Sequence, residues 1–254
     1  MQKSILQRVP KKLNSDAGFI KIVAMTSMLI DHVGYVFFPY IPEMRIIGRI
    51  AMPLFCYGIM MGSIHSKNLF RYALRLLVLF LISQPFYMLA LNHRISEMNV
   101  LATLLLGLIG IIGIQKRKYG SQFWLPFICL ILAAAQQMDY GWRGVLLILL
   151  MYLTRNSRGG MIALMVSFCL YWGTGSSEIT MLFGIRIKPA LAPGSFLYPV
   201  SGMFFSFLRL QCMAILSLPF IIFSTNTEVR VPKLISYLMY PGHLLIIWLL
   251  SLAV

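Results

Sequence analysis

The sequence predicts an all-α protein, a polytopic bundle of transmembrane helices. The 254-residue chain is 59% hydrophobic and only 11% charged, and its mean hydropathy is +0.81. Its apolar residues gather in runs of about 20 residues, which is the length a helix needs to cross the hydrocarbon core of a bilayer. Short polar segments rich in Lys and Arg separate these runs, as is usual in multispanning proteins.

Candidate spans can be placed along the whole chain, and we expect about 8 to 10 of them. They cover residues 18–38, 45–64, 71–91, 99–114, 123–138, 142–154, 159–174, 201–224 and 234–253. The stretch 176–200 contains three prolines and is expected to be a loop or a re-entrant segment. Residues 1–17 form a basic segment, and residues 18–254 are expected to form a single transmembrane domain.

The positive charge is distributed unevenly between the two sides of the predicted bundle. If the N-terminus is cytoplasmic, 15 of the 22 Lys and Arg residues lie on the inner side and 7 on the outer side. The positive-inside rule therefore favours a cytoplasmic N-terminus. The same pattern explains the net charge of +15, so the lipid bilayer and not nucleic acid is the expected partner.

Small residues and cysteines indicate packing and not chemistry. Gly58 and Gly62 lie one turn apart in the second span, and Gly107, Gly110 and Gly113 follow one side of the fourth. Such spacing lets helix backbones approach closely. The four cysteines are scattered without the spacing of metal ligands, so no metal is expected.

Ionisable residues inside predicted spans are the strongest functional signal. Asp31 and His32 lie in the first span, and Arg49 lies at a similar depth in the second, with Arg45 one turn above it. Intramembrane charges usually pair and mark a functional site, although a purely structural ion pair is the alternative. Histidine beside aspartate favours function, because histidine exchanges a proton near neutral pH.

Three further positions are weaker candidates. Asp139 precedes the sixth span in "DYGWRG", where it could be a functional carboxylate or a helix cap. Gln84 and Pro85 interrupt the third span. His243 lies at mid-depth in the last span beside Pro241, where it could be functional or a satisfied structural histidine.

A basic helix face is predicted at the inner end of the third span. Lys67, Arg71 and Arg75 recur every four residues and so share one face. They can be orientation charges at a membrane surface, or a cradle for a phosphorylated cytosolic cofactor, since phosphates are bound by clustered Lys and Arg.

Several segments together resemble the TraX family, named for the membrane protein that acetylates the amino terminus of conjugative pilin. They are "FIKIVAMTSMLIDHVGYVFFP", "MRIIGRIAMPLFCY", "HSKNLFRYALRLL", "NVLATLLLGL", "DYGWRGVLLILLMYLTRN" and "KLISYLMYPGHLLIIWLL". The resemblance covers about residues 18 to 254 and is weakest over 176–200. The family's motifs fall on Asp31 and His32, on Gly48 and Arg49, on Asp139 and Gly141, and on Tyr240, Pro241 and His243. Gln84 stands where many family members are expected to have an acidic residue.

The resemblance implies a multi-pass acyltransferase-like domain in the bacterial inner membrane. It would use acetyl-CoA or another acyl-CoA as co-substrate, and a pilin or another envelope protein would be its acceptor and partner. His32, tuned by Asp31, is the expected base, and Arg49 is expected to stabilise the oxyanion. His243 is a further catalytic candidate, and Arg45, Lys67, Arg71, Arg75, Gln84, Asp139 and Tyr240 are candidates for binding.

Two other classes of function are compatible with the same residues. In a proton-coupled transporter, Asp31, His32, Arg49 and His243 would form a proton relay. In a non-catalytic subunit of a pilus or secretion system, the same side chains would be packing polar groups. The absence of an internal repeat speaks against a common transporter design.

Overall fold

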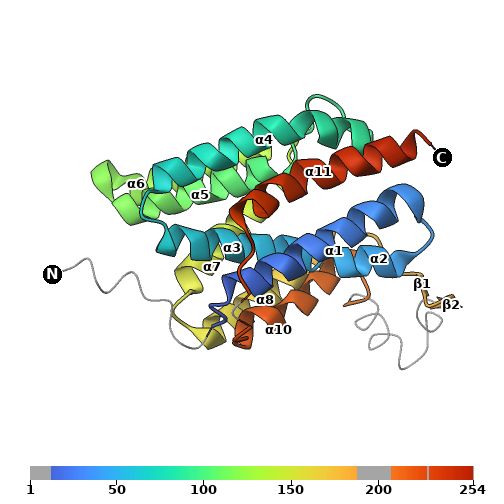
Figure 1. Ribbon diagram of the computed structural model, residues 1–254. Helices are drawn as coiled ribbons and strands as arrows, with labels where there is room; N and C mark the ends of the chain where they lie inside the picture. Colours follow the sequence, from blue (N-terminus) through green and yellow to red (C-terminus); the bar gives the residue numbers. More distant parts are fainter. Residues whose placement is uncertain (1–12, 188–206, 228, 254) are drawn as a thin grey trace, which may run out of the picture.

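A computed structural model describes residues 13–187, 207–227 and 229–253 (Figure 1). Helices dominate these residues, which confirms the all-α prediction. Within the described residues, four helical segments are long and apolar enough to cross a membrane: Ala17–Phe37, Pro42–His65, Leu69–Leu91 and Leu234–Ser251. Val100–Lys116, Gly141–Thr154 and Leu210–Ile222 are shorter apolar helices. The protein is therefore a membrane helix bundle. Most of the predicted basic segment 1–17 lies outside the described residues.

Polar side chains at helix starts explain several of the boundaries. Asp16, Asn68, Asn99 and Ser157 each accept a backbone hydrogen bond from the first turn of the helix that follows. The elements are α1 (Ala17–Phe37), α2 (Pro42–Gly48), α3 (Ala51–His65), α4 (Leu69–Leu91), α5 (Val100–Lys116), η1 (Lys118–Gly120), α6 (Ser121–Ala135), α7 (Gly141–Thr154), α8 (Arg158–Gly173), β1 (Met181–Leu182), β2 (Ile185–Arg186), η2 (Leu210–Ser217), α10 (Leu218–Ile222) and α11 (Lys233–Ser251).

The second predicted span is not one uniform helix. The span expected over 45–64 is present as Pro42–His65, and within it the chain turns at Arg49 and Ile50, which divides the span into α2 and α3. Gly48 explains the close approach of α2 to α1, since a Cβ at this position would overlap the Asp31 carboxyl group. The turn therefore brings Arg49 directly beside Asp31.

The region after α8 also differs from a simple span. Residues 181–186 form a short antiparallel hairpin, in keeping with the loop expected for 176–200, of which 188–200 lie outside the described residues. The span expected over 201–224 is wrong for its described part. There η2 and α10 form two short consecutive helices, and Pro219 lies at the start of the second. Proline cannot donate the backbone hydrogen bond that a continuous helix would need.

The helices around α1 form the part of the bundle that positions the candidate site. α1 packs against α2, α3 and α11, while α4 packs against α5 and α11. α7 packs against α3, α5 and α6. The close contacts predicted for the fourth span are confirmed, because a Cβ at Gly107 or Gly110 would press into side chains of α7. The prediction for Gly58 is wrong, since a Cβ there would meet no atom within 4 Å.

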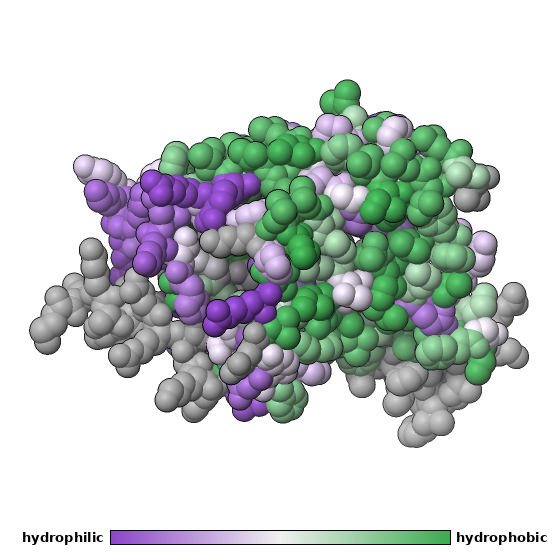
Figure 2. Space-filling view, viewed as in Figure 1, coloured by the Kyte–Doolittle hydropathy of each residue, from purple (hydrophilic) through white to green (hydrophobic). Residues whose placement is uncertain are grey.

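The surface has the polarity expected of a membrane protein. Figure 2 shows a broad hydrophobic face over α4, α11 and α1, and hydrophilic residues gathered at the end where α3 joins α4. Large apolar side chains of α4 and α11, such as Leu81 and Leu238, are exposed. Their exposure is unfavourable in water and is favourable against lipid.

Candidate functional site

A polar pocket of about 220 Å³ lies between α1, α2 and the segments that lead into α5 and α7. Its ionisable lining brings together residues from four separate parts of the sequence. Five predicted site residues line it: Asp31, His32, Arg45, Arg49 and Asp139. The structure therefore gathers nearly half of the predicted site at one cavity. Concave sites with a few convergent polar groups are where ligands usually bind.

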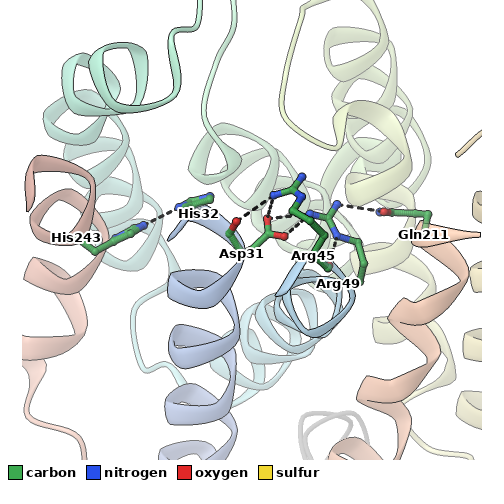
Figure 3. A network of polar contacts seen from close by, with 6 residues as sticks. All are labelled: Asp31, His32, Arg45, Arg49, Gln211 and His243. Carbon is green, nitrogen blue, oxygen red and sulfur yellow. Dashed lines mark hydrogen bonds and ion pairs between the residues drawn. The ribbon is translucent and has the colours of Figure 1, made fainter. Parts of the chain in front are cut away.

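The Asp31 carboxylate is held between two arginines (Figure 3). Nη2 of Arg49 donates to both of its oxygens at 2.7 and 2.8 Å, and Nη1 of Arg45 lies 2.9 Å from Oδ2. Arg45 also donates to the backbone carbonyl of Asp31 at 3.1 Å. The predicted pairing of Asp31 with Arg49 is thus present. The three side chains together carry one net positive charge beside the pocket.

Arg49 is engaged on three sides. Besides its bonds to Asp31, it donates from Nη1 to Gln211 at 3.3 Å and from Nε to the Arg45 carbonyl at 3.3 Å. Sequence reasoning missed Gln211, because only the fold brings η2 next to α2. Among the described residues, Arg45 in contrast donates only from Nη1, and its side chain is 25% exposed.

In the described part of the chain, His32 makes no hydrogen bond with Asp31, so any tuning of His32 by Asp31 is not through a direct bond. Successive residues of a helix point about 100° apart, so the two side chains leave α1 in different directions. Nδ1 of His32 lies 2.8 Å from Nε2 of His243 in α11, and the two rings stack with an interplanar angle of 10°. The two predicted catalytic histidines are therefore direct partners.

The hydrogen bonds of this pair fix which nitrogen carries a proton. Nδ1 of His243 lies 2.7 Å from the Met239 carbonyl oxygen, which can only accept. With both rings neutral, Nε2 of His243 is then an acceptor and Nδ1 of His32 is the donor. Nε2 of His32 is left with its lone pair, and His32 lines the polar pocket. A base is thus available at the pocket.

Asp139 lies in the turn between α6 and α7. Tyr140 and Gly141 follow it with φ angles of 64° and 48°, so the chain reverses sharply. Asp139 is not the helix cap that sequence reasoning left open, since Tyr140 takes that position without a side-chain bond. Withdrawal from water raises the pKa of the Asp139 carboxyl to about 6, although nearby Arg49 lowers it. This carboxylate can therefore attract a cation at neutral pH.

His93 also lines the pocket, and sequence reasoning missed it. Its ring stacks on Tyr87 at a centroid distance of 4.6 Å, and its Nδ1 lies 2.7 Å from Oε2 of Glu97. The signal was a His and a Glu four residues apart in the loop after α4. Gln84 does not line the pocket. It anchors this loop by donating to the Glu97 carbonyl at 2.7 Å and accepting from Asn99.

A larger apolar cavity of about 450 Å³ adjoins the polar pocket. Met28, Phe55 and Val100 line both, so the two are neighbours. Lys21, His65 and Ser236 line the cavity near the starts of α1 and α11 and the end of α3. Tyr240 lines the cavity and packs edge-on to His243. Gly58 lines it as well, which explains the open space beside that glycine.

The predicted basic cradle is a separate surface cavity of about 430 Å³. Ser66, Lys67, Asn68, Arg71, Leu74 and Arg75 line it. Arg75 also lies over the ring of Tyr72, at 5.9 Å from its centroid, and Tyr72 lines the apolar cavity. Arg75 of the cradle thus contacts a residue that lines the apolar cavity.

Comparisons with known proteins agree with these features. Residues 16–251 match the family described as TraX protein. A 145-residue stretch is 29% identical to "Probable fimbrial assembly protein FimC, serogroup H1" of Dichelobacter nodosus, and covers 52% of this chain and 59% of that relative. A 38-residue stretch is 53% identical to "Uncharacterized protein RP591" of Rickettsia prowazekii (strain Madrid E), 15% of each chain. No solved structure matches. Because the family match spans nearly its whole length, the chain belongs to the TraX family.

Proposed function

We propose that this protein is a membrane-embedded acyltransferase that moves an acetyl or other acyl group from acyl-CoA to an amine. The observation that carries the proposal is the lone pair of His32 Nε2 at a pocket that also holds two arginines and adjoins an apolar cavity. Acyl transfer needs a base for the nucleophile and positive charge for the oxyanion, and this site offers both.

The three cavities suit the parts of an acyl-CoA molecule. The cradle of Lys67, Arg71 and Arg75 offers positive charge to the nucleotide phosphates. The apolar cavity would take the pantetheine arm, and its contact with the polar pocket at Met28, Phe55 and Val100 would deliver the thioester to His32. In this arrangement the cradle faces the cytoplasm, where acyl-CoA is found.

The chemistry follows from the side chains of the pocket. His32 Nε2 takes a proton from the acceptor amine as its nitrogen attacks the thioester carbonyl. Arg45 is better placed than Arg49 to contact the developing oxyanion directly, since Arg49 is engaged by Asp31, Gln211 and a backbone carbonyl. Arg49 contributes its charge and positions Asp31. When the C–S bond breaks, His32 returns its proton to the leaving thiolate.

The acceptor we propose is the N-terminal amine of a pilin or a similar envelope protein. The family match and a relative whose printed name is that of a fimbrial assembly protein support this class. The Asp139 carboxylate would attract the acceptor ammonium group before reaction. The protein would lie in the bacterial inner membrane with its N-terminus in the cytoplasm, as the charge distribution favours.

A proton-coupled transporter fits the described residues less well. Its relay would run through His32 and His243, but Nδ1 of His243 is bonded to the Met239 carbonyl, which has no proton to pass on. A non-catalytic subunit would not need a base whose lone pair is left, within the described part of the chain, without a partner at a pocket. Proton flux in proteoliposomes without acyl transfer would favour the transporter.

Intact-mass spectrometry of membrane proteins from cells tests the proposal and identifies the acceptor. Cells would carry the wild type, His32→Ala, no protein, or the control Cys129→Ala, whose side chain is buried in α6. We expect an acyl-sized mass gain on one envelope protein with the wild type and the control alone. A mass gain that persists with His32→Ala would mean that another residue is the base. No mass gain in any of the cells would count against acyl transfer.

A further inference from the structure

The loop between α4 and α5 holds a second histidine at the polar pocket. Nδ1 of His93 lies 2.7 Å from the Glu97 carboxylate, and Glu97 also accepts a bond from the backbone N–H of Arg94 at 2.9 Å. The flat stack on Tyr87 fixes the plane of the ring. Gln84 holds the loop through the Glu97 carbonyl. The ring is therefore fixed by contacts on two sides.

These contacts determine which ring nitrogen is basic. A carboxylate only accepts, so Nδ1 of His93 is the donor and Nε2 carries the lone pair in the neutral ring. The bond from Arg94 and the ring of His93 lower the pKa of Glu97, so it stays ionised at neutral pH and stabilises a protonated His93. The side chain of His93 is 31% exposed, so the ring contacts water. His243 is buried in contrast.

The reaction itself requires two proton acceptors when the nucleophile is an ordinary amine. An N-terminal amino group has a pKa of about 8, so it is mostly an ammonium group at neutral pH. The ammonium nitrogen loses two protons before it becomes an amide nitrogen with one hydrogen. One proton ends on the sulfur of the leaving thiol, and the other must reach water. His32 accounts for the proton that ends on sulfur. It has no evident path for the proton that must reach water.

We propose that His93, oriented by Glu97, takes the first proton from the acceptor ammonium and releases it to water. This rests on the proposed acyl transfer. Nε2 of His93 removes one proton, and the neutral amine attacks the thioester carbonyl to form the C–N bond. His32 removes the second proton and gives it to the thiolate as the C–S bond breaks. The sum is acyl-CoA and an ammonium giving an amide, CoA thiol and one proton.

The charges around His93 suit a proton that is taken up and then released. The ionisable groups that line the pocket with it are Asp31, His32 and Tyr35 of α1, Arg45 of α2, Arg49 of the turn after α2, Tyr87 of α4, and Asp139 and Tyr140 of the turn before α7. Glu97 and Asp139 favour the protonated ring, while the two arginines oppose it.

The experiment compares two acceptors that differ in how many protons they must lose. Purified protein in lipid nanodiscs receives acetyl-CoA with either an alanine-initiated peptide or trifluoroethylamine, a weak base that is neutral at pH 7. Product is measured by mass spectrometry for the wild type, His93→Gln, Glu97→Gln and the control Ile95→Ser. Ile95 is 83% exposed on the same loop. Unfolding temperatures verify that each variant is folded.

We expect His93→Gln to slow transfer to the peptide by about 10²-fold at pH 7, and transfer to trifluoroethylamine by less than about threefold. The slowing of transfer to the peptide should become smaller as the pH rises above the pKa of the peptide's terminal amine. Glu97→Gln, which keeps the ring, should give a smaller deficit of the same kind, and Ile95→Ser none. If His93→Gln slowed transfer equally for both acceptors at every pH, or did not slow it at all, the proposed role of His93 would be overturned. A wild type that acetylates neither amine would instead count against the proposed function.

Discussion

Asp31 and His32 are neighbours in the sequence, but they belong to two different environments. Asp31 is buried and bonded to Arg45 and Arg49, and this ion cluster joins α1 to α2. His32 bonds to His243 of α11 and keeps one nitrogen with a lone pair at the pocket. Both carboxylate oxygens of Asp31 are bonded to arginines, whereas His32 keeps one ring nitrogen whose lone pair has no partner among the described residues.

The difference shows how adjacent polar residues in a membrane helix can have separate tasks. A buried ion pair costs desolvation and tolerates no loss of a partner, so it suits a fixed structure. A base must exchange its proton and therefore needs an unoccupied nitrogen. On this account, Asp31 determines where α2 and Arg45 lie, and His32 carries out proton transfer.

The largest effect on stability is expected at Asp31. Asp31→Ala leaves two arginines without their carboxylate, and breaking a buried pair in this way costs about 3–5 kcal/mol. We expect a large fall in the unfolding temperature, measured in detergent micelles. The double variant Asp31→Leu, Arg49→Met should recover part of it, because an apolar pair of similar volume removes the unpaired charge. If Asp31→Ala were as stable as the wild type, the structural role assigned to Asp31 would be wrong.

Substitution of Asp139 is expected to change stability by an intermediate amount that depends on pH. Its pKa in the protein is raised to about 6, so the ionised form is disfavoured by folding, and stability is lost as the pH rises from about 4 to 6. At neutral pH, Asp139→Asn should therefore raise stability by up to about 3 kcal/mol while it weakens binding of the acceptor amine.

The check on Asp139 is a pair of thermal unfolding series. The gain from Asp139→Asn should be present above pH 7 and should vanish below about pH 4, where the wild-type carboxyl is protonated as well. A gain that is independent of pH would show that the carboxylate charge is not its cause.

The smallest effect is expected at the cradle, far from the reacting atoms. Replacing Lys67, Arg71 and Arg75 with Ala should raise the KM for acetyl-CoA by about tenfold, which corresponds to about 1.4 kcal/mol. The KM for acetyl-pantetheine, which lacks the nucleotide, should not change. The matched control replaces Lys116, Arg117 and Lys118, which run from the end of α5 to the start of η1. Equal effects of the two triple variants would mean that only overall charge matters.

Much of the fold follows from local features of the sequence. Apolar runs long enough to span a bilayer gave the limits of α1, α4 and α11 closely, because burial in lipid constrains length and composition strongly. The pairing of Asp31 with Arg49 was also predictable, since two helices joined by a short loop must run side by side. The division at Arg49 was not, because it depends on the close approach of Gly48 to α1.

Long-range partners could not be predicted. The contact of His32 with His243 joins residues 211 positions apart, and only the packing of α1 against α11 creates it. His93 and Glu97 carry a local signal, but it does not show that their loop is held beside the turn that carries Asp139, whose backbone N–H donates to the Met98 carbonyl. Gln84 has a polar side chain inside a span, yet its contacts make it an anchor of that loop.

The most direct measurement is the release of CoA by purified protein in nanodiscs that contain the acceptor found in cells. His32→Gln should slow this release by about 10²- to 10⁴-fold and lower stability by only about 1 kcal/mol, the net contribution of one hydrogen bond. Cys129→Ala should release CoA at the wild-type rate. Release from His32→Gln at the wild-type rate, by a protein that is equally well folded, would contradict the assignment of the chemistry to the His32 side.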